Sequence, residues 1–216
     1  MHGETIPRRR LIAATGAAAG LAMAPRLVSA AIAPATPAQS EGPFYPVRLP
    51  DDRDADLVRV TGADAEAIGV VTHVMGRVLA RDGRPLPGVL VEIWQCDAHG
   101  RYRHPREWGG SAPDAGFQGY GQTLTDASGA YRFRTIRPVG YPGRTPHIHF
   151  KLGSFAGELL TTQMYVAGEP GNERDGLLNA IRDLELRRRL LVELRPADTI
   201  EPGALAGTFD IVLDAG

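Results

Sequence analysis

The sequence predicts an all-β protein, an antiparallel β-sandwich with long loops and one short helix. Three observations support this prediction. The chain is rich in residues that interrupt helices, with 26 glycines and 17 prolines among 216 residues. Several short segments alternate apolar and polar residues, as strands with one buried face do. Turn signals such as Asp82-Gly83 and Ser128-Gly129 separate these segments at intervals of roughly ten residues.

Residues 1–30 are expected to be an export signal rather than part of the fold. Three arginines at 8–10 precede a mildly apolar run of alanine and glycine, and residues 28–30 offer a small-residue cleavage site. A buried first helix is the alternative, but Pro25 would break it. Paired arginines ahead of such a run are typical of the twin-arginine pathway, which exports folded proteins. We therefore expect a periplasmic or extracellular protein, exported by this route rather than by general secretion.

Composition narrows the classes of partner. The formal net charge is −1 and no basic patch dominates, which argues against nucleic acid or an anionic membrane. No stretch after the signal is long and apolar enough for stable insertion into a bilayer. Cys96 is the single cysteine, so the chain has no internal disulfide. We interpret Cys96 as a small buried apolar residue rather than a catalytic thiol.

Residues 31–39 are expected to be a linker, and residues 40–216 a single domain. Residues 40–46 contain too much glycine and proline for a helix or a central strand, so they predict a loop packed across the body by Phe44 and Tyr45. The four aspartates at 51, 52, 54 and 56, which surround Arg53, predict a solvated loop rather than a calcium site.

The strands of the domain are predicted from alternation and from the turns between them. They are expected at residues 70–80, 89–94, 130–136, 147–152, 159–166, 189–193 and 208–213. Residues 100–121 predict a long irregular segment, of the kind that usually carries function. Residues 171–175 predict a loop, and residues 176–183 the one short helix.

His147 and His149 are the strongest chemical signal. Side chains on a strand change face at each step, so the two imidazoles share one face while Ile148, Phe150 and Leu152 share the other. Two imidazoles on one face form half of a metal site. An isolated pair of this kind is more often two exposed or core histidines, so further ligands are needed.

Tyr102 and Tyr141 are the candidates for the other half. Taken singly, each tyrosine is more often an amphipathic core residue than a ligand. A phenol has a pKa of about 10, so at neutral pH it binds as phenolate only beside a strong Lewis acid. Anionic oxygen donors suit Fe(III), whereas zinc more often takes cysteine, histidine and carboxylate. His99 and His104, which flank Tyr102, are rival ligands.

The chain resembles the intradiol ring-cleavage dioxygenases, and among them the iron-binding subunit of protocatechuate 3,4-dioxygenase. The joint order and spacing of several motifs carry the resemblance, which covers most of residues 40–213. The motifs are Glu-Gly-Pro-Phe-Tyr at 41–45, Leu-Pro-Gly-Val-Leu-Val-Glu-Ile-Trp-Gln at 86–95, Gly-Arg-Tyr-Arg-His at 100–104, Arg-Thr-Ile-Arg-Pro at 134–138, Tyr-Pro at 141–142 and His-Ile-His-Phe at 147–150.

The resemblance implies a non-haem Fe(III) centre and a set of roles. The implied metal ligands are Tyr102, Tyr141, His147 and His149. Tyr141 is implied to be the axial ligand that leaves and accepts a proton, while Tyr102 stays bound. Arg144 is implied to lie over the substrate, and Gln163 to support the oxygenated intermediate.

The activity that the resemblance implies is cleavage of a catechol-type ring by O2. The bond between the two hydroxyl-bearing carbons breaks, both oxygen atoms are incorporated, and a muconate-type diacid forms. The segment between Tyr141 and Arg144 is much shorter than in the protocatechuate or catechol enzymes and lacks the tryptophan that often follows Tyr-Pro. Because that loop helps to wall the pocket, the identity of the catechol stays open, as does a homo-oligomeric assembly.

Two other interpretations are weighed against the dioxygenase. Residues 74–102 also resemble transthyretin-like and carboxypeptidase regulatory-like domains, which would make the protein a non-catalytic binding module. The second alternative interpretation is an iron-free companion subunit of the dioxygenase. Neither needs all four of the implied ligands, and the sequence has kept all four.

Overall fold

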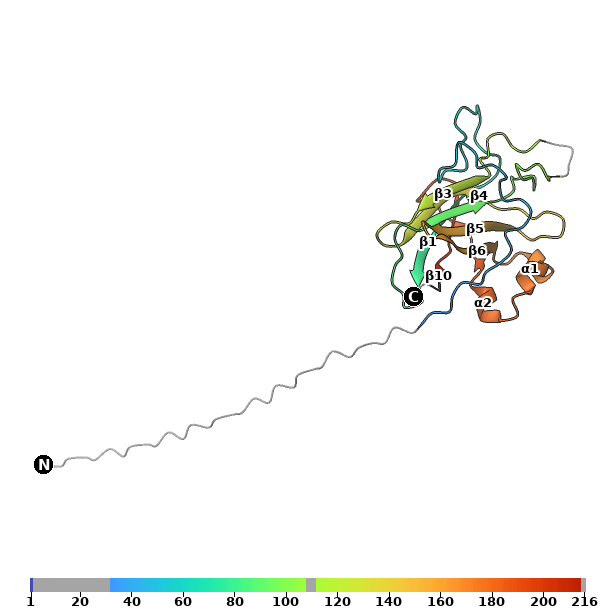
Figure 1. The fold of residues 1–216 in the computed structure, drawn as a ribbon. Coiled ribbons are helices and arrows are strands. Elements are labelled where there is room, and N and C mark those ends of the chain that lie inside the picture. Colours follow the sequence, from blue (N-terminus) through green and yellow to red (C-terminus); the bar gives the residue numbers. More distant parts are fainter. Residues whose placement is uncertain (2–31, 108–111, 215–216) are drawn as a thin grey trace.

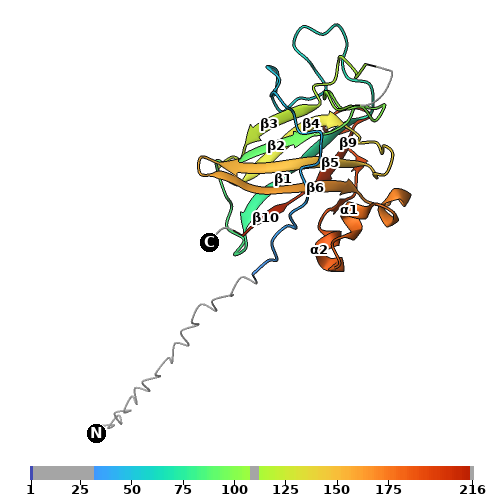
Figure 2. The same cartoon turned by 45° about the vertical axis from the view of Figure 1, so that its right-hand side comes forward.

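The structure, a computed structural model, describes Met1, residues 32–107 and residues 112–214. The expected export signal therefore lies outside the described residues, apart from Met1. In the described part of the chain, ten strands form two five-stranded sheets. The sheets stack face to face (Figures 1 and 2), which confirms the predicted sandwich.

The first sheet is built around the long strand β1 (Val71–Ala80). On one side β1 pairs antiparallel with β4 (Ala130–Ile136). On the other side it pairs parallel with β9 (Leu205–Thr208) and then β10 (Ile211–Leu213), and β8 (Arg195–Pro196) pairs antiparallel with β9. Most strand pairs of the sandwich are antiparallel, as predicted, and these parallel pairs were not predicted. They arise because the chain completes the second sheet before it returns to β1, and parallel pairing needs such a long connection.

The second sheet has the order β3 (Tyr120–Leu124), β2 (Leu90–Trp94), β5 (His147–Ser154), β6 (Gly157–Val166) and β7 (Leu191–Val192). Only the pair of β6 and β7 is parallel. Strand β3 was not predicted. It is an edge strand that contains a glycine and polar residues, so its sequence lacks the apolar alternation of a half-buried strand.

Three short helical segments connect β6 to β7 and lie together at one corner of the sandwich (Figure 1). They are the 3₁₀ helix η1 (Pro170–Glu173), α1 (Gly176–Asn179) and α2 (Leu184–Arg188). The sequence predicted one helix over residues 176–183, but the structure has two short α-helices, one ending at Asn179 and one beginning at Leu184. The Asp183 side chain accepts hydrogen bonds from the N–H groups of Glu185 and Leu186, and this cap starts a second helix.

The core lies between the two sheets. Its largest members are fully buried aromatic and branched side chains, among them Ile93, Phe133, Ile148, Phe150, Leu152 and Phe209. No helix in the described ranges is long and apolar enough to cross a bilayer. Cys96 is buried as predicted, and burial, its main cause, raises the pKa of this thiol to about 12, so it is no nucleophile at neutral pH.

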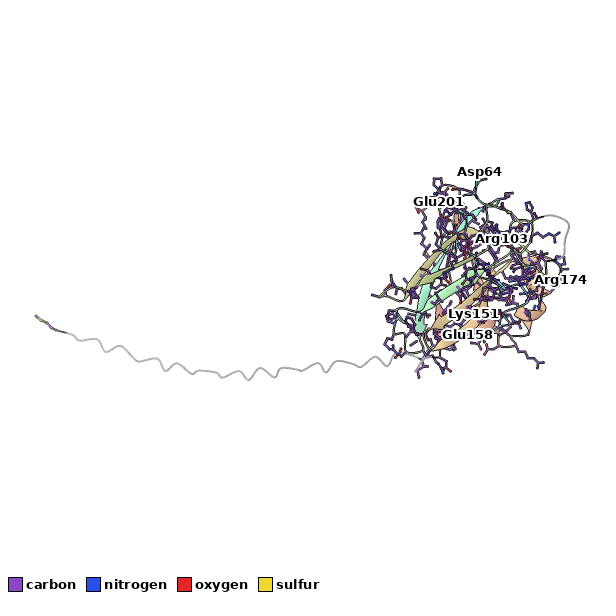
Figure 3. The ribbon with its side chains drawn as sticks, turned by 45° about the horizontal axis from the view of Figure 1, so that its top comes forward. Asp64, Arg103, Lys151, Glu158, Arg174 and Glu201 are labelled. Carbon is purple, nitrogen blue, oxygen red and sulfur yellow. The ribbon has the colours of Figure 1, made fainter. Side chains whose placement is uncertain are left out.

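Residues 33–46, which we call the N-terminal strap, cross the edge of the sandwich onto the outer face of the second sheet. The Thr36 N–H donates to Val212 of β10, and the Gln39 N–H donates to Thr161 of β6. Residues 31–39, expected as a linker, are thus held on the body from Ala33 onward, without helix or strand. Lys151 of β5 pairs with Glu41 of the strap at 2.6 Å and with Glu158 at 3.4 Å. Figure 3 labels Lys151 and Glu158, which lie side by side.

Candidate metal centre

The outer face of the second sheet presents His147 and His149 on β5. Strand register places Trp94 of β2 and Gln163 of β6 directly beside His149, and Tyr165 beside His147. Ile148 and Phe150 point into the core with no exposed surface, so the predicted alternation is confirmed. The sheet therefore gathers polar and aromatic side chains on its outer face at one end of β5.

The imidazoles of His147 and His149 face each other through their Nε2 atoms. Nε2 of His147 lies 3.2 Å from Nε2 of His149, and both side chains are almost completely buried. Nδ1 of His147 lies 2.6 Å from the Thr145 carbonyl oxygen, which can only accept, so the proton of His147 sits on Nδ1 and its Nε2 carries a lone pair. The Trp94 ring stacks on His149 at 4.7 Å and fixes its plane.

Tyr102 reaches the imidazoles from the loop that follows β2. A turn begins this loop, where the Gly100 N–H donates to the Asp97 carbonyl and Gly100 has a φ of 75°. The Glu107 carboxylate accepts from the Tyr102 N–H at 3.1 Å, and Phe44 of the strap stacks on the phenol ring at 4.5 Å. Tyr102 is 3% exposed and is held from both sides.

Tyr141 reaches the same point from a two-residue turn. The N–H of Tyr141 donates to the Arg144 carbonyl at 3.2 Å, and the Arg144 N–H donates back at 2.9 Å. Pro142 and Gly143, with φ of 84° at Gly143, fit the central positions of a type II turn. The short Tyr141–Arg144 segment noted in the sequence is this hairpin, which places the phenol and the guanidinium side by side.

The structure brings the four implied ligands into one closed cluster. Ring centroids are separated by 5.7 Å for Tyr102 and Tyr141, 5.5 Å for Tyr141 and His147, 4.8 Å for His147 and His149, and 6.2 Å for His149 and Tyr102. Residues from two loops and one strand thus converge on one point.

The rival ligands His99 and His104 lie outside this cluster. Nδ1 of His104 accepts from the Arg106 N–H at 3.1 Å, and its ring meets the edge of Phe44. His99 is exposed on the wall of a neighbouring cavity. In the described part of the chain, neither ring contacts the two imidazoles of β5.

Burial controls the charge of the cluster. It lowers the pKa of His147 to about 4 and that of His149 well below its usual range, with the Arg144 charge adding to both effects. Burial also raises the pKa of Tyr102 and of Tyr141, and for Tyr141 the Arg144 charge opposes it. Without a metal, all four side chains are therefore neutral at pH 7.

Two polar atoms of the cluster have no partner within the described residues. The Tyr102 hydroxyl and Nδ1 of His149 are buried without a hydrogen bond, and the two Nε2 atoms face each other. Unmet buried donors and lone pairs are rare in folded proteins, and a cation bound among them removes the cost. Across residues 32–107 and 112–214, His, Cys, Asp and Glu alone form no cluster of three, so any metal here needs the phenols. Two phenols and two imidazoles fit Fe(III).

Arg144 is held beside the cluster by three side chains. Its Nε donates to Asp175 at 2.8 Å, and its Nη2 donates to Gln163 at 2.6 Å and to the Tyr165 hydroxyl at 3.2 Å. Gln163 in turn donates through Nε2 to the carbonyl of Ser40 in the strap. Both ends of the Gln163 amide are thus engaged, between Arg144 and the strap.

Asp175 and Trp94 were not singled out from the sequence. Asp175 is 31 residues from Arg144 along the chain, and its only local signal is that of a helix cap before Gly176. Trp94 ends an apolar strand and looks like an ordinary core residue. Phe44 was expected to pack across the body, but its contact with Tyr102 depends on the strap's path.

Two cavities open on either side of Tyr141. One, of about 490 Å³, is lined by Phe44, His99, Glu107 and Pro142 among others. The second, of about 210 Å³, is lined by Gly143, Arg144, Arg174 and Asp175 as well as Tyr141. Figure 3 shows Arg174 at the helical corner. A small molecule can therefore approach the cluster from solvent past Tyr141.

Comparison with known proteins gives concordant matches. Residues 40–215 match the family model described as Dioxygenase. Over 169 residues the chain is 41% identical to the protocatechuate 3,4-dioxygenase beta chain of Burkholderia cepacia, which covers 74% of this chain and 71% of that protein. Over 179 residues it is 33% identical to catechol 1,2-dioxygenase 2 of Acinetobacter lwoffii, and here it spans 62% of the relative's length.

Solved structures share the fold. The dioxygenase domain of a dioxygenase carbohydrate-binding protein fusion from Streptomyces sp. SirexAA-E superposes with a TM-score of 0.63 at 36% identity, covering 85% of this chain and all of that one. An intradiol ring-cleavage dioxygenase from Tetranychus urticae superposes with a TM-score of 0.67 over 84% of this chain and 95% of that one; at 21% identity it supports the fold alone.

Proposed function

Because this chain belongs to the intradiol ring-cleavage dioxygenase family, we propose that it is a non-haem Fe(III) enzyme that cleaves a catechol-type ring with O2. The observation that supports this most is the convergence of two phenols and two imidazoles, in which the Tyr102 hydroxyl and Nδ1 of His149 are buried without a partner in the described structure. A cluster of this kind has no role in a non-catalytic sandwich module, and no observation favours that alternative or an iron-free companion subunit.

The proposed reaction balances without another reactant. A catechol and one O2 molecule give one muconate-type diacid. The carbon–carbon bond between the two hydroxyl-bearing carbons breaks, and each of these carbons ends as a carboxylate carbon with one oxygen atom from O2. The ring thus supplies the electrons that reduce O2, and no external reductant is needed.

Tyr102, Tyr141, His147 and His149 would hold the ferric ion. When bound there, the ion supplies a Lewis acid and an electron sink for the catechol oxygens. The stacked rings of Phe44 on Tyr102 and of Trp94 on His149 shield this point from water on the sides that they cover. Low water access strengthens every charge interaction within the site.

Tyr141 and Arg144 are the groups that we assign to the substrate. Tyr141 is the more exposed of the two phenols and lines both cavities, so its Oη is the atom placed to receive a proton from a catechol hydroxyl. Arg144 lies opposite Tyr141 on the other arm of the same hairpin and offers a fixed positive charge. A preorganised charge of this kind stabilises negative charge that develops on the substrate without further rearrangement.

By analogy with the family, we assign Gln163 to the reacting substrate as well. Gln163 also acts on Arg144, because its amide oxygen accepts from the guanidinium while its amide nitrogen is anchored to the strap. We therefore expect loss of the Gln163 amide to affect turnover through Arg144 as well.

Metal analysis and a visible spectrum of the purified protein test this proposal first. Charge transfer from tyrosinate to iron should colour it red, and Tyr102→Phe or His149→Ala should lose iron and colour. Oxygen uptake across a panel of catechols then tests turnover and ranks substrates. A colourless wild-type protein, or one that is coloured but inert with every catechol, would contradict the enzyme proposal.

Export by the twin-arginine pathway is a separate proposal. It rests on the arginines at 8–10, the mild apolar run after them and the small residues at 28–30. Replacing both Arg8 and Arg9 by lysine should retain the protein in the cytoplasm, as fractionation would show. Unchanged export of this variant would contradict the twin-arginine route.

A further inference from the structure

Asp175 is a fully buried carboxylate at the end of the loop before α1. Its Oδ1 accepts from the N–H groups of Leu177 and Leu178, both at 3.0 Å. Its Oδ2 accepts from Nε of Arg144 at 2.8 Å and from the Thr145 N–H at 3.0 Å. One carboxylate therefore caps a helix with one oxygen and holds the guanidinium with the other.

The surroundings keep Asp175 ionised although it has no exposed surface. Burial by itself would raise its pKa, but the donors on Leu178, Arg144 and Thr145 outweigh burial and lower it. Burying a charged carboxylate costs free energy. A helix cap does not need the charge, since a neutral side chain such as Asn caps about as well. This points to the contact with Arg144 as the reason for an aspartate here.

The guanidinium of Arg144 is planar and has two edges committed. Nε is bonded to Asp175, and Nη2 to Gln163 and Tyr165. Among the described residues none accepts a hydrogen bond from Nη1. Because the plane is fixed at two points, the third nitrogen is fixed with it, and Arg144 lines the cavity that also borders Tyr141.

We propose that Asp175 is a positioning residue, which acts through Arg144 by fixing the plane of the guanidinium so that its free edge meets the bound catechol. This inference rests on the proposed dioxygenase function, since it assigns Arg144 to the substrate. Asp175 itself does not touch the substrate. The site thereby includes a residue from the helical corner, which is 31 residues away from Arg144 along the chain.

The loop that carries Asp175 is also anchored independently of it. The Thr145 hydroxyl donates to Asn172 at 2.9 Å, and the Asn172 amide donates to the Val166 carbonyl at 2.8 Å. Asn caps helices about as well as Asp does. Asp175→Asn should therefore keep α1 and the loop while it loses the charged contact with Arg144.

The chain offers a matched control in Asp183. It caps α2 as Asp175 caps α1, with its side chain accepting from two helix N–H groups, and it has no contact with Arg144. Asp183→Asn reproduces the change of charge and cap without the proposed effect. Both variants are compared with wild type for iron content, thermal unfolding, catechol binding without oxygen, and kcat and KM for catechol.

We expect Asp175→Asn to lower kcat by roughly 10- to 100-fold, with iron content and anaerobic catechol affinity nearly unchanged. This is less than the roughly 100- to 1,000-fold that removal of a preorganised donor costs, because the guanidinium itself remains. Asp183→Asn should keep the wild-type kcat. In an Arg144→Ala background, Asp175→Asn should lower kcat no further, because its effect passes through the missing guanidinium. Should Asp175→Asn fail to fold, Arg144→Lys is the second variant, and it should show the same loss because lysine lacks the planar fork.

Four results would overturn the inference while the dioxygenase proposal stands, and three of them concern single variants. They are wild-type kcat in Asp175→Asn, an equal loss of kcat in Asp175→Asn and Asp183→Asn, and wild-type kcat in Arg144→Lys. A further loss of similar size in the Arg144→Ala background would also overturn it, since Asp175 would then act independently of Arg144. A wild-type protein that consumes no oxygen with catechol contradicts the proposed function instead, so the two failures are distinguishable.

Discussion

Tyr102 and Tyr141 differ in how firmly the protein holds them, although both phenols meet the same imidazoles. Tyr102 is buried under Phe44, and Glu107 accepts from its backbone N–H. Tyr141 sits on a two-residue turn and borders two cavities. This difference in burial is the reason why we propose Tyr141, rather than Tyr102, as the phenol that meets the substrate.

Removing the Tyr102 hydroxyl should not destabilise the metal-free protein. This hydroxyl is buried without a hydrogen bond in the described structure, and such a group costs about 1–3 kcal/mol. Tyr102→Phe should therefore leave the free energy of unfolding of the metal-free protein unchanged or raise it by up to about 1 kcal/mol. Denaturant unfolding after chelation measures the change.

Tyr131→Phe is the matched control for this prediction. The Tyr131 hydroxyl is equally buried but donates to the Phe209 carbonyl, so its loss removes a made hydrogen bond and should cost about 1 kcal/mol. Equal destabilisation by the two substitutions would show that the Tyr102 hydroxyl has a partner in solution and would weaken the argument for a cation there.

Metal uptake should release protons from the phenols. Both tyrosines are protonated in the metal-free protein because burial raises their pKa, and each must lose its proton to bind as phenolate. The affinity for ferric ion should therefore rise with pH, as competition with a chelator at several pH values would show. In Tyr102→Phe any remaining affinity should depend less steeply on pH; an affinity independent of pH in the wild type would exclude phenolate ligation.

Strand β5 shows what local pattern could predict and what it could not. The alternation of His147 to Leu152 predicted which side chains face outward, because that depends only on the period of a strand. The convergence of Tyr102 and Tyr141 on the same point could be anticipated only through family resemblance. It depends on loops whose paths are set by distant contacts, such as the bond between the Tyr102 N–H and Glu107.

The Tyr141–Arg144 hairpin depends on the backbone conformation of one glycine. Gly143 has a φ of 84°, and a Cβ added there would meet no atom within 4 Å, so only backbone strain opposes a larger residue. Gly143→Ala should cost about 1–2 kcal/mol of stability and lower turnover, because the turn places both Tyr141 and Arg144. Thermal unfolding and oxygen uptake measure the two effects.

Gly176→Ala is the control for the hairpin prediction. Gly176 is equally open to a Cβ but begins α1 without a positive φ, so alanine should be neutral or raise stability by up to about 1 kcal/mol. Similar destabilisation by both substitutions would show that φ at Gly143 is not the cause.

At the scale of the whole molecule, loops from distant parts of the chain close over both outer faces of the sandwich. On the first sheet, Arg134 of β4 pairs with Asp56 at 3.0 Å and with Glu201, from the loop between β8 and β9, at 2.7 Å. Figure 3 shows Glu201 well away from Lys151 and Arg174. None of these pairings could be predicted from the sequence, because charged residues are common and carry no periodic signal of their partner.

This network predicts how stability depends on pH. Glu201 accepts from Arg134 and lies 3.0 Å from His73, and these contacts lower its pKa from 4.5 to about 2 despite partial burial. Burial lowers the pKa of His73 from 6.5, and Arg132 lowers it further against the opposing effect of Glu201. Both folded-state pKa values lie below the unfolded ones, so both contributions are complete above pH 6.5 and are lost as the pH falls.

Acid should therefore destabilise the protein in two ranges. The contribution of His73 begins to be lost below pH 6.5, and that of Glu201 below pH 4.5, ending near pH 2. In Glu201→Gln the lower range should flatten, while the His73 range should still begin near pH 6.5 but extend to lower pH. Without the carboxylate that favours the charged form, the folded-state pKa of His73 falls further. Unfolding temperatures from pH 3 to pH 8 measure both effects.

The iron content of Glu201→Gln provides the control. His73, Arg134 and Glu201 lie on the first sheet and the candidate metal centre lies on the second, so the iron content of this variant at pH 7 should match that of wild type. Loss of iron there would mean that the two faces of the sandwich are coupled.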